Sequence, residues 1–193
     1  MASLVESIVA LERALDDARV PHAFGGALAL AFHIEEPRGT RDIDVNVFLA
    51  PDRVEQVFAA LPPSVQRTER DADRVRRDGQ VRVFWDETPI DLFFTTHTFH
   101  DTAQIHVDRV PFAGTTIPVL GATELVVFKA FFDRTKDWAD IEAIAEAGSA
   151  DLHTAIGWLV DLLGGDDLRV ARLRALLRTD GSVPAQPRFD PRR

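Results

Sequence analysis

The segment that most constrains the fold of this chain is Asp42-Ile43-Asp44-Val45-Asn46-Val47-Phe48, in which polar and apolar side chains alternate. Successive side chains of a strand point to opposite faces, so Asp42, Asp44 and Asn46 share one face of the expected strand. Two carboxylates on one face repel each other unless a cation lies between them. Mg²⁺ is commonly bound by one or two carboxylates together with phosphate oxygens, which this face could supply. Taken alone, however, Asp-x-Asp is better explained as a polar stripe that faces solvent.

The remaining sequence divides into a mixed part and a helical part. The periodicity predicts helices over 3–18, 27–32 and 51–61, a strand at 22–24, a hairpin formed by 81–85 and 90–94, and one or two strands within 105–119. Only helices are expected after Gly121, over 122–133, 136–147, 151–163 and 166–178. The stretch 66–82 is interpreted as a solvated connection of mixed charge, in preference to a nucleic-acid-binding patch.

These patterns predict an α/β (α+β) fold, with a mixed β-sheet flanked by helices and a C-terminal helical annex. We expect residues 1–120 to form the domain that holds the site and 121–180 to form a helical region packed on it. Residues 181–193 contain several prolines and are expected to be disordered.

Composition excludes several classes of protein. The 193 residues contain no cysteine, which excludes disulfide scaffolds, cysteine nucleophiles and cysteine-ligated metal sites. The formal net charge of −9 argues against non-specific binding to nucleic acid, although a local basic groove remains compatible with it. The chain has no apolar run of the ~20 residues that a membrane span needs, and Glu6 and Glu12 interrupt the apolar N-terminal stretch. A cytoplasmic protein without a membrane partner is therefore expected.

Two further features add to the Asp-x-Asp segment. Gly25-Gly26 directly precedes an expected helix, where glycines allow a backbone to approach a phosphate, although an ordinary strand-to-helix turn looks the same. Asp91 lies between Ile90 and Leu92 in an apolar strand, which favours a partner such as a shared metal over the alternative of a hairpin residue facing water.

In combination, these residues resemble the nucleotidyltransferase fold of the DNA polymerase β superfamily, and in particular its small bacterial AbiEii-type toxins and lincosamide-type antibiotic nucleotidyltransferases. The resemblance rests on Gly25-Gly26-Ala27-Leu28-Ala29-Leu30, on Arg38-Gly39-Thr40-Arg41-Asp42-Ile43-Asp44, on Lys129, and on Lys136-Asp137-x-x-Asp140-Ile141, and it covers roughly residues 20–145. The interval from Gly26 to Asp42 is longer than in the polymerase-like members, which favours the small-molecule or toxin branch.

The resemblance implies a role for each matching residue. Asp42, Asp44 and Asp91 would be the catalytic residues and would hold Mg²⁺ (two ions), with Asp91 also deprotonating the acceptor hydroxyl. Gly25 and Gly26 would bind phosphate, and weaker candidates for phosphate or nucleotide contact are Arg38, Thr40, Lys129 and Lys136. The implied reaction moves a nucleoside monophosphate from an NTP such as ATP to a hydroxyl acceptor, which could be a small molecule such as an antibiotic, or a tRNA or protein target of a toxin. The alternative is a non-catalytic nucleotide-binding or antitoxin-like regulatory protein on the same fold.

Three side chains outside the carboxylate set are further candidates. Lys129 lies in a helix that is apolar almost all round, so its ammonium group must either reach solvent at the rim or find an anion in the cleft, and the sequence leaves both alternatives open. His97 and His100 could share a helix face as metal ligands, but without a third ligand nearby both are expected at the surface.

Overall fold

The computed structural model describes residues 3–179 of the chain. The helices are α1 (Leu4–Asp17), α2 (Gly26–Leu30), the 3₁₀ turn η1 (Pro51–Arg53), α3 (Val54–Ala60), α4 (Glu69–Asp78), α5 (Phe99–Ile105), α6 (Ala122–Phe132), α7 (Thr135–Glu146), α8 (Leu152–Leu163) and α9 (Leu168–Thr179). The strands are β1 (His22–Phe24), β2 (Ile43–Val47), β3 (Val65–Gln66), β4 (Gln80–Trp85), β5 (Thr88–Phe94), β6 (Asp108–Phe112) and β7 (Thr115–Val119). The segment 181–193, expected to be disordered, lies outside the described residues.

The strands of residues 3–179 form one sheet in the order β3-β4-β5-β2-β1-β7-β6. The β2–β5 and β1–β7 pairs are parallel and the other neighbouring pairs are antiparallel, so the sheet is mixed, as expected from the sequence. Strand β2 lies in the interior of the sheet, between β5 and β1. The expected hairpin is confirmed as β4–β5, and the strands expected within 105–119 are β6 and β7, which pair with each other as a second hairpin.

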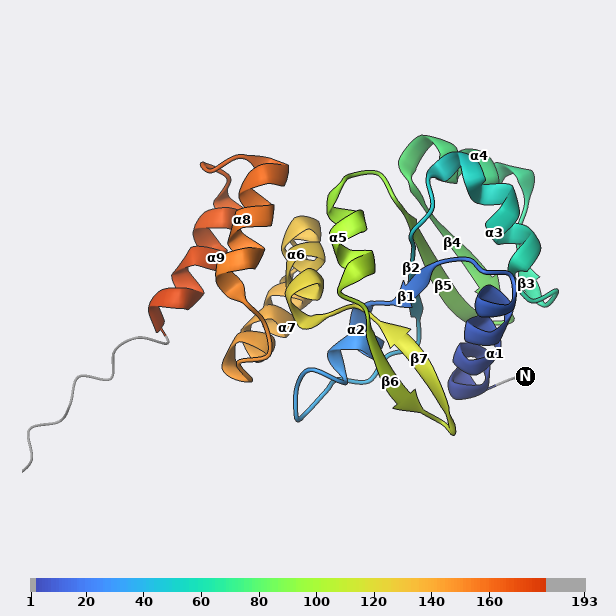
Figure 1. Ribbon diagram of the computed structural model, residues 1–193, viewed down its shortest axis with the longest axis horizontal. Helices are drawn as coiled ribbons and strands as arrows, with labels where there is room; N and C mark the ends of the chain where they lie inside the picture. The colour runs from blue at the N-terminus through green and yellow to red at the C-terminus, as the bar shows by residue number, and fades with distance from the viewer. Residues whose placement is uncertain (1–2, 180–193) are drawn as a thin grey trace, which may run out of the picture.

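The sheet separates two groups of helices. Figure 1 shows α1, α3 and α4 on one side of the sheet and α2, α5 and α6 on the other, with α8 and α9 farther out along the same side. Helix α6 packs against α2, α7 and α8 and so joins the C-terminal helices to the sheet. The side chains of Ile43, Val45 and Val47 are buried in the core, as the alternation in β2 predicts.

The mixed-charge stretch within 66–82 is not the irregular connection that the sequence indicated. Most of it forms α4, which begins at a capping box between Thr68 and Asp71 and ends at Gly79 in the left-handed conformation (φ 69°). Ala72 and Val75, three positions apart, supply the buried face. The alternating charges lie on the exposed face of a helix, which composition alone does not distinguish from a solvated loop.

Four other segments differ from the expectation. The helix expected over 27–32 ends at Leu30, and the helix expected over 51–61 opens with a 3₁₀ turn. The strand β3 and the helix α5 were not expected from the sequence. Trp138 is fully buried, and Trp85 and Trp158 are half-buried. Within the described residues no helix is both long and apolar enough to cross a bilayer.

Candidate active site

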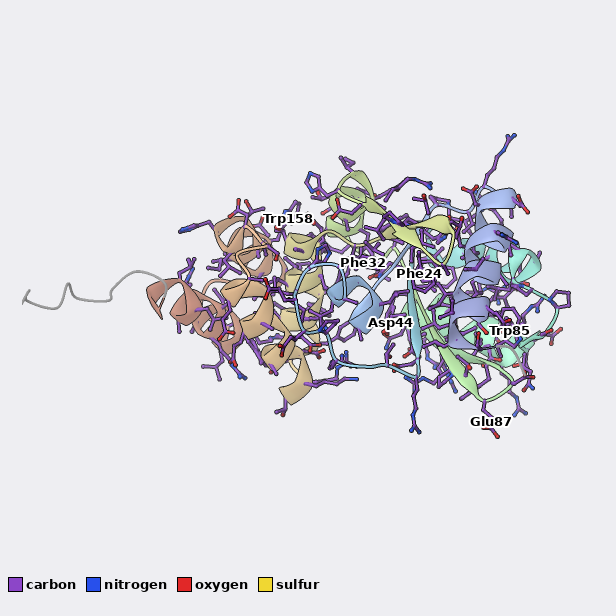
Figure 2. The ribbon with its side chains drawn as sticks, turned by 90° about the horizontal axis from the view of Figure 1, so that it is seen from below. Phe24, Phe32, Asp44, Trp85, Glu87 and Trp158 are labelled. Atoms are coloured by element: carbon purple, nitrogen blue, oxygen red, sulfur yellow. The ribbon has the colours of Figure 1, made fainter. Side chains whose placement is uncertain are left out.

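The parallel register of β2 and β5 brings the carboxylates predicted from the sequence to one place in the fold. Asp44 on β2 pairs directly with Asp91 on β5, and Asp42 immediately precedes β2. Neighbouring strands lie about 4.8 Å apart, so the side chains of Asp44 and Asp91 are adjacent on the same face of the sheet. That face looks toward α6, because Asp44, Asn46 and Phe93 line a small cavity together with residues of α6. In Figure 2, Asp44 lies near the middle of the molecule, between the strands and the C-terminal helices.

The environment of Asp44 disfavours its negative charge. Burial raises the pKa of the Asp44 carboxyl group to about 6, and the nearby charges of Asp42 and Asp91 act in the same direction. The charges of Lys129 and Arg134 oppose this shift only in part. A carboxylate that is destabilised by burial and by neighbouring carboxylates gains most from a bound cation.

Asp42 differs from Asp44 because its charge is stabilised. The Thr40 hydroxyl donates a hydrogen bond to the Asp42 carboxylate, and this bond is the main reason that the pKa of Asp42 is lowered. The positive charges of Lys136 and Arg82 lower it further. Thr40 therefore orients an acidic side chain of the site, a role that the sequence did not indicate.

The Gly25–Gly26 turn lies against the same carboxylates. Gly26 has a positive φ of 55°, and a Cβ atom at this position would overlap the Asp44 carboxylate. A Cβ atom on Gly25 would lie 2.7 Å from the Asn46 side-chain nitrogen. The Gly25 N–H donates to the carbonyl oxygen of Asp44 at 2.9 Å, which fixes the turn to β2. Gly26 is therefore required by its left-handed φ and by the Asp44 carboxylate, whereas a Cβ atom at Gly25 would have to displace the Asn46 amide group.

Arg82 is a residue of this site that the sequence analysis missed. It pairs with Asp91 across the β4–β5 hairpin, and its Nε and Nη2 atoms donate to the two Asp91 carboxylate oxygens at 2.7 and 2.6 Å. Its Nη2 atom also lies 3.8 Å from Asp42 Oδ2. The Arg82–Asp91 ion pair could have been predicted from the sequence, because the two residues face each other once the hairpin is paired about its Asp86–Glu87 turn.

A buried ionic network joins the loop before β2 to α6 and α7. Asp140, which is buried, accepts a hydrogen bond from Lys129 Nζ at 2.6 Å and a two-pronged contact from Arg38. Asp137 is buried as well, lies 3.8 Å from Lys129 Nζ, and pairs with Arg134 at 2.6 Å. Of the two outcomes expected for Lys129, the structure shows burial against an anion, and that anion is an aspartate of the protein. Lys136, in contrast, is exposed.

The donor set suits Mg²⁺ in chemistry, because carboxylate oxygens are the ligands this ion prefers. The three aspartates do not form a closed cage: within residues 3–179 no group of three or more His, Asp or Glu side chains has the spacing to hold a metal ion. Arg82 is bound to both oxygens of Asp91 and so competes with a cation for that carboxylate. An open site is nevertheless compatible with Mg²⁺, which usually takes only one or two protein carboxylates beside water and phosphate oxygens.

Comparison with known proteins identifies the fold. No protein-family model and no curated protein matches the sequence. Among solved structures, ANT(2'')-Ia in complex with adenylyl-2''-tobramycin is similar at a TM-score of 0.54 and 16% identity, over 94% of this chain and 100% of that chain. The solution structure of the antibiotic-resistance factor ANT(2'')-Ia gives 0.52 and 16%, over 91% of each chain. An antigenic nucleotidyltransferase-like protein from Paracoccidioides brasiliensis gives 0.51 and 15%, over 89% of this chain and 90% of that one.

Proposed function

We propose that this chain, which has the nucleotidyltransferase fold, is an Mg²⁺-dependent enzyme that transfers a nucleoside monophosphate from an NTP to a hydroxyl group of a small molecule. The observation that carries this proposal is the pairing of Asp44 with Asp91 beside the Gly25–Gly26 turn. The adenylylated antibiotic bound to ANT(2'')-Ia supports a small molecule as the acceptor, in preference to a tRNA or protein target.

Asp42 and Asp44 are the residues that would hold the cation. Asp42 is ionised readily because of Thr40, and Asp44 carries a charge that is poorly stabilised without a positive partner. Bound Mg²⁺ would neutralise the triphosphate and the charge that develops on its α-phosphorus during transfer.

The proposed step forms a bond between the acceptor hydroxyl oxygen and the α-phosphorus. The bond from that phosphorus to the oxygen bridging to the β-phosphorus breaks, and pyrophosphate leaves with its electron pair. The hydroxyl proton passes to the Asp91 carboxylate and then to solvent. Arg82 keeps Asp91 oriented by occupying one lone pair on each oxygen, and a second lone pair on each oxygen remains to accept the proton.

The phosphates would meet Gly26 at the start of α2, together with the exposed cation Lys136 and with Arg134, which is exposed although it pairs with Asp137. The N–H of Gly25 is bound to Asp44, so Gly25 would contribute space for the phosphate rather than a hydrogen bond. Arg38 and Lys129 are held by Asp140, which reduces the positive charge that they offer to a ligand. Their contribution would be to fix α7 against the loop that precedes β2.

The test begins with NTP binding, measured by isothermal titration calorimetry with and without Mg²⁺. We expect binding that depends on Mg²⁺ and that is lost in Asp44→Asn. Asp108→Asn, which alters an exposed aspartate on the edge strand β6, serves as the matched control and should bind as the wild type does. An NTP that binds neither with nor without Mg²⁺ would overturn the proposal.

Catalysis is then tested by following pyrophosphate release across a panel of hydroxyl-bearing small molecules. We expect release with at least one member and a loss of more than 100-fold in Asp91→Asn, because a positioned base typically contributes 10²–10⁴-fold. Mg²⁺-dependent binding without release for any acceptor would instead favour the non-catalytic, regulatory alternative.

A further inference from the structure

A second cavity, of about 140 Å³, lies beside the small cavity that Asp44 lines, which we call the carboxylate cleft. Its walls are largely aromatic and come from the end of β5, the start of α5 and one face of α6. The aromatic members of its lining are Phe93, Phe94, Phe99, Phe128, Phe131 and Phe132. A cavity of about 150 Å³ with apolar walls holds one benzene-sized ring, so this one matches a single ring in volume.

The two cavities share a wall. Phe93, Phe128 and Phe132 line both of them, and the rings of Phe93 and Phe132 are 5.5 Å apart. Phe93 follows Asp91 by two positions on β5, so both side chains lie on the same face of the sheet. Two residues of a strand span roughly 7 Å, so the aromatic wall at Phe93 and the Asp91 carboxylate are separated by a distance of this order.

Among the polar side chains of the lining, which are Asp78, Gln80, Thr96, His97 and His100, His100 is the most buried. His100 is 8% exposed, and its Nδ1 atom lies 3.1 Å from the carbonyl oxygen of His97. A carbonyl oxygen only accepts, so Nδ1 carries the proton of the neutral ring and Nε2 keeps a lone pair. Burial lowers the pKa of His100, which favours that neutral ring. Within the described residues Nε2 makes no hydrogen bond. The expectation that His100 lies at the surface is therefore wrong, whereas His97 is exposed as expected.

We propose that this cavity binds an apolar ring of the acceptor and that His100 Nε2 accepts a hydrogen bond from a hydroxyl or N–H group on that ring. The identification of the ligand as the acceptor rests on the proposed function. The acceptor class is then a small molecule with one donor-bearing aromatic or aliphatic ring, whose reactive hydroxyl lies roughly 7 Å from the ring so that it reaches Asp91.

Ring binding is tested without nucleotide or metal, so that it stands independently of the proposed catalysis. Phenol and anisole are titrated separately into the full chain and followed by NMR. Phenol is expected to bind about tenfold more tightly than anisole, because only phenol donates a hydrogen bond, and a tenfold ratio corresponds to about 1.4 kcal/mol. In His100→Phe the ring and its packing are kept and the lone pair is removed, so the two probes should bind equally.

The variant that fills the cavity is Leu162→Phe, since Leu162 lines it from α8 and does not line the cavity at Asp44. Leu163→Phe is the matched control, because it makes the same change at the adjacent half-buried position outside the lining. Thermal melting of both variants shows whether the fold is kept. We expect phenol binding to be lost in Leu162→Phe and unchanged in Leu163→Phe. Failure of phenol to bind the wild type, or equal binding to both variants, would overturn the inference.

The link to the acceptor is tested with 3-phenylpropan-1-ol and propan-1-ol as probe acceptors in the pyrophosphate assay. The phenyl compound should give at least tenfold higher kcat/KM in the wild type, and that advantage should disappear in Leu162→Phe. Equal kcat/KM for the two alcohols, with phenol still bound, would show that the cavity does not serve the acceptor. A complete absence of Mg²⁺-dependent NTP binding would instead show that the proposed function has failed, while the phenol titration still reports on the cavity.

Discussion

Asp44 and Asp91 are direct partners in the parallel ladder of β2 and β5, although they lie far apart in the sequence. A parallel neighbour cannot be reached through a tight turn, so the chain between them forms α3, α4 and β4 before it returns. The result is a pair of adjacent carboxylates fixed by main-chain hydrogen bonds rather than by a flexible loop. The stability of the protein should therefore depend on how these charges are compensated.

Asp44→Asn should stabilise the metal-free protein at pH 8. The pKa of Asp44 is raised to about 6, above its unfolded value, so the stability that its proton contributes is fully present below the unfolded pKa and is lost as pH rises through about 6. From this shift, the ionised group costs about 3 kcal/mol at pH 8. Urea unfolding at pH 4 and pH 8 measures the effect.

The difference between wild type and Asp44→Asn should be small at pH 4 and largest at pH 8. Added Mg²⁺ should stabilise the wild type at pH 8 and leave Asp44→Asn nearly unchanged. A variant that is less stable than the wild type at pH 8 would show that the carboxylate serves the fold instead of a ligand.

The acidic strand could be predicted because its signal is local. Alternation from Ile43 to Val47 fixes which side chains share a face, and Gly25-Gly26 marks the turn that approaches them. Asp91 could be named as a candidate from its apolar neighbours, but its pairing with Asp44 depends on strand order, which periodicity does not specify.

The partner of Arg38 and Lys129 could not be assigned from the sequence because it lies on another element. Both residues resembled ligands for phosphate, and both bind Asp140 on α7. Arg82 differs, because the expected hairpin places it opposite its counter-ion Asp91. Ion-pair partners follow from tertiary packing, whereas hydrophobic periodicity reports only local structure.

Lys129→Met should destabilise the protein by about 3 kcal/mol, because removing one partner leaves Asp140 with an incompletely compensated buried charge. Lys136→Met is the matched control, since Lys136 is exposed and its replacement should change stability by less than about 0.5 kcal/mol. Chemical unfolding of both variants provides the comparison.

For nucleotide binding we expect the opposite order, with the direct effect coming from Lys136 and not from Lys129. Lys136→Met should weaken Mg·NTP binding while the fold is unaffected. Lys129→Met should weaken Mg·NTP binding only to the extent that it destabilises the fold. If Lys129→Met kept the stability of the wild type and lost nucleotide binding, the ammonium group would be a direct ligand of phosphate.

Gly26→Ala should disrupt the site even though it adds a single methyl group. The residue has a left-handed φ, and the new Cβ atom would overlap the Asp44 carboxylate. We expect the free energy of unfolding to fall by about 2 kcal/mol, as is typical of a strained backbone position, and Mg·NTP binding to be lost.

Gly157→Ala on the exposed face of α8 is the matched control, because a Cβ atom there meets nothing within 4 Å. It should instead stabilise the protein by about 0.5–1 kcal/mol. Equal effects of the two substitutions in thermal melting would contradict the close approach at Gly26.

Arg82→Gln should increase the affinity of the site for Mg²⁺ while it impairs transfer. The guanidinium group binds Asp91 and lies 3.8 Å from Asp42, so it repels a cation that approaches the same carboxylates. Removing one positive charge near the surface is worth about 1–2 kcal/mol toward a divalent ion, or roughly tenfold in affinity at low salt. Calorimetric titration with Mg²⁺ measures the gain. Arg77→Gln, on the exposed face of α4, is the control and should leave Mg²⁺ affinity unchanged.

Transfer should nevertheless fall in Arg82→Gln, because Asp91 loses the contact that orients it toward the acceptor. Tighter Mg²⁺ binding with undiminished transfer would show that Arg82 only competes with the metal, and unchanged Mg²⁺ binding would place the ion away from Asp42 and Asp91.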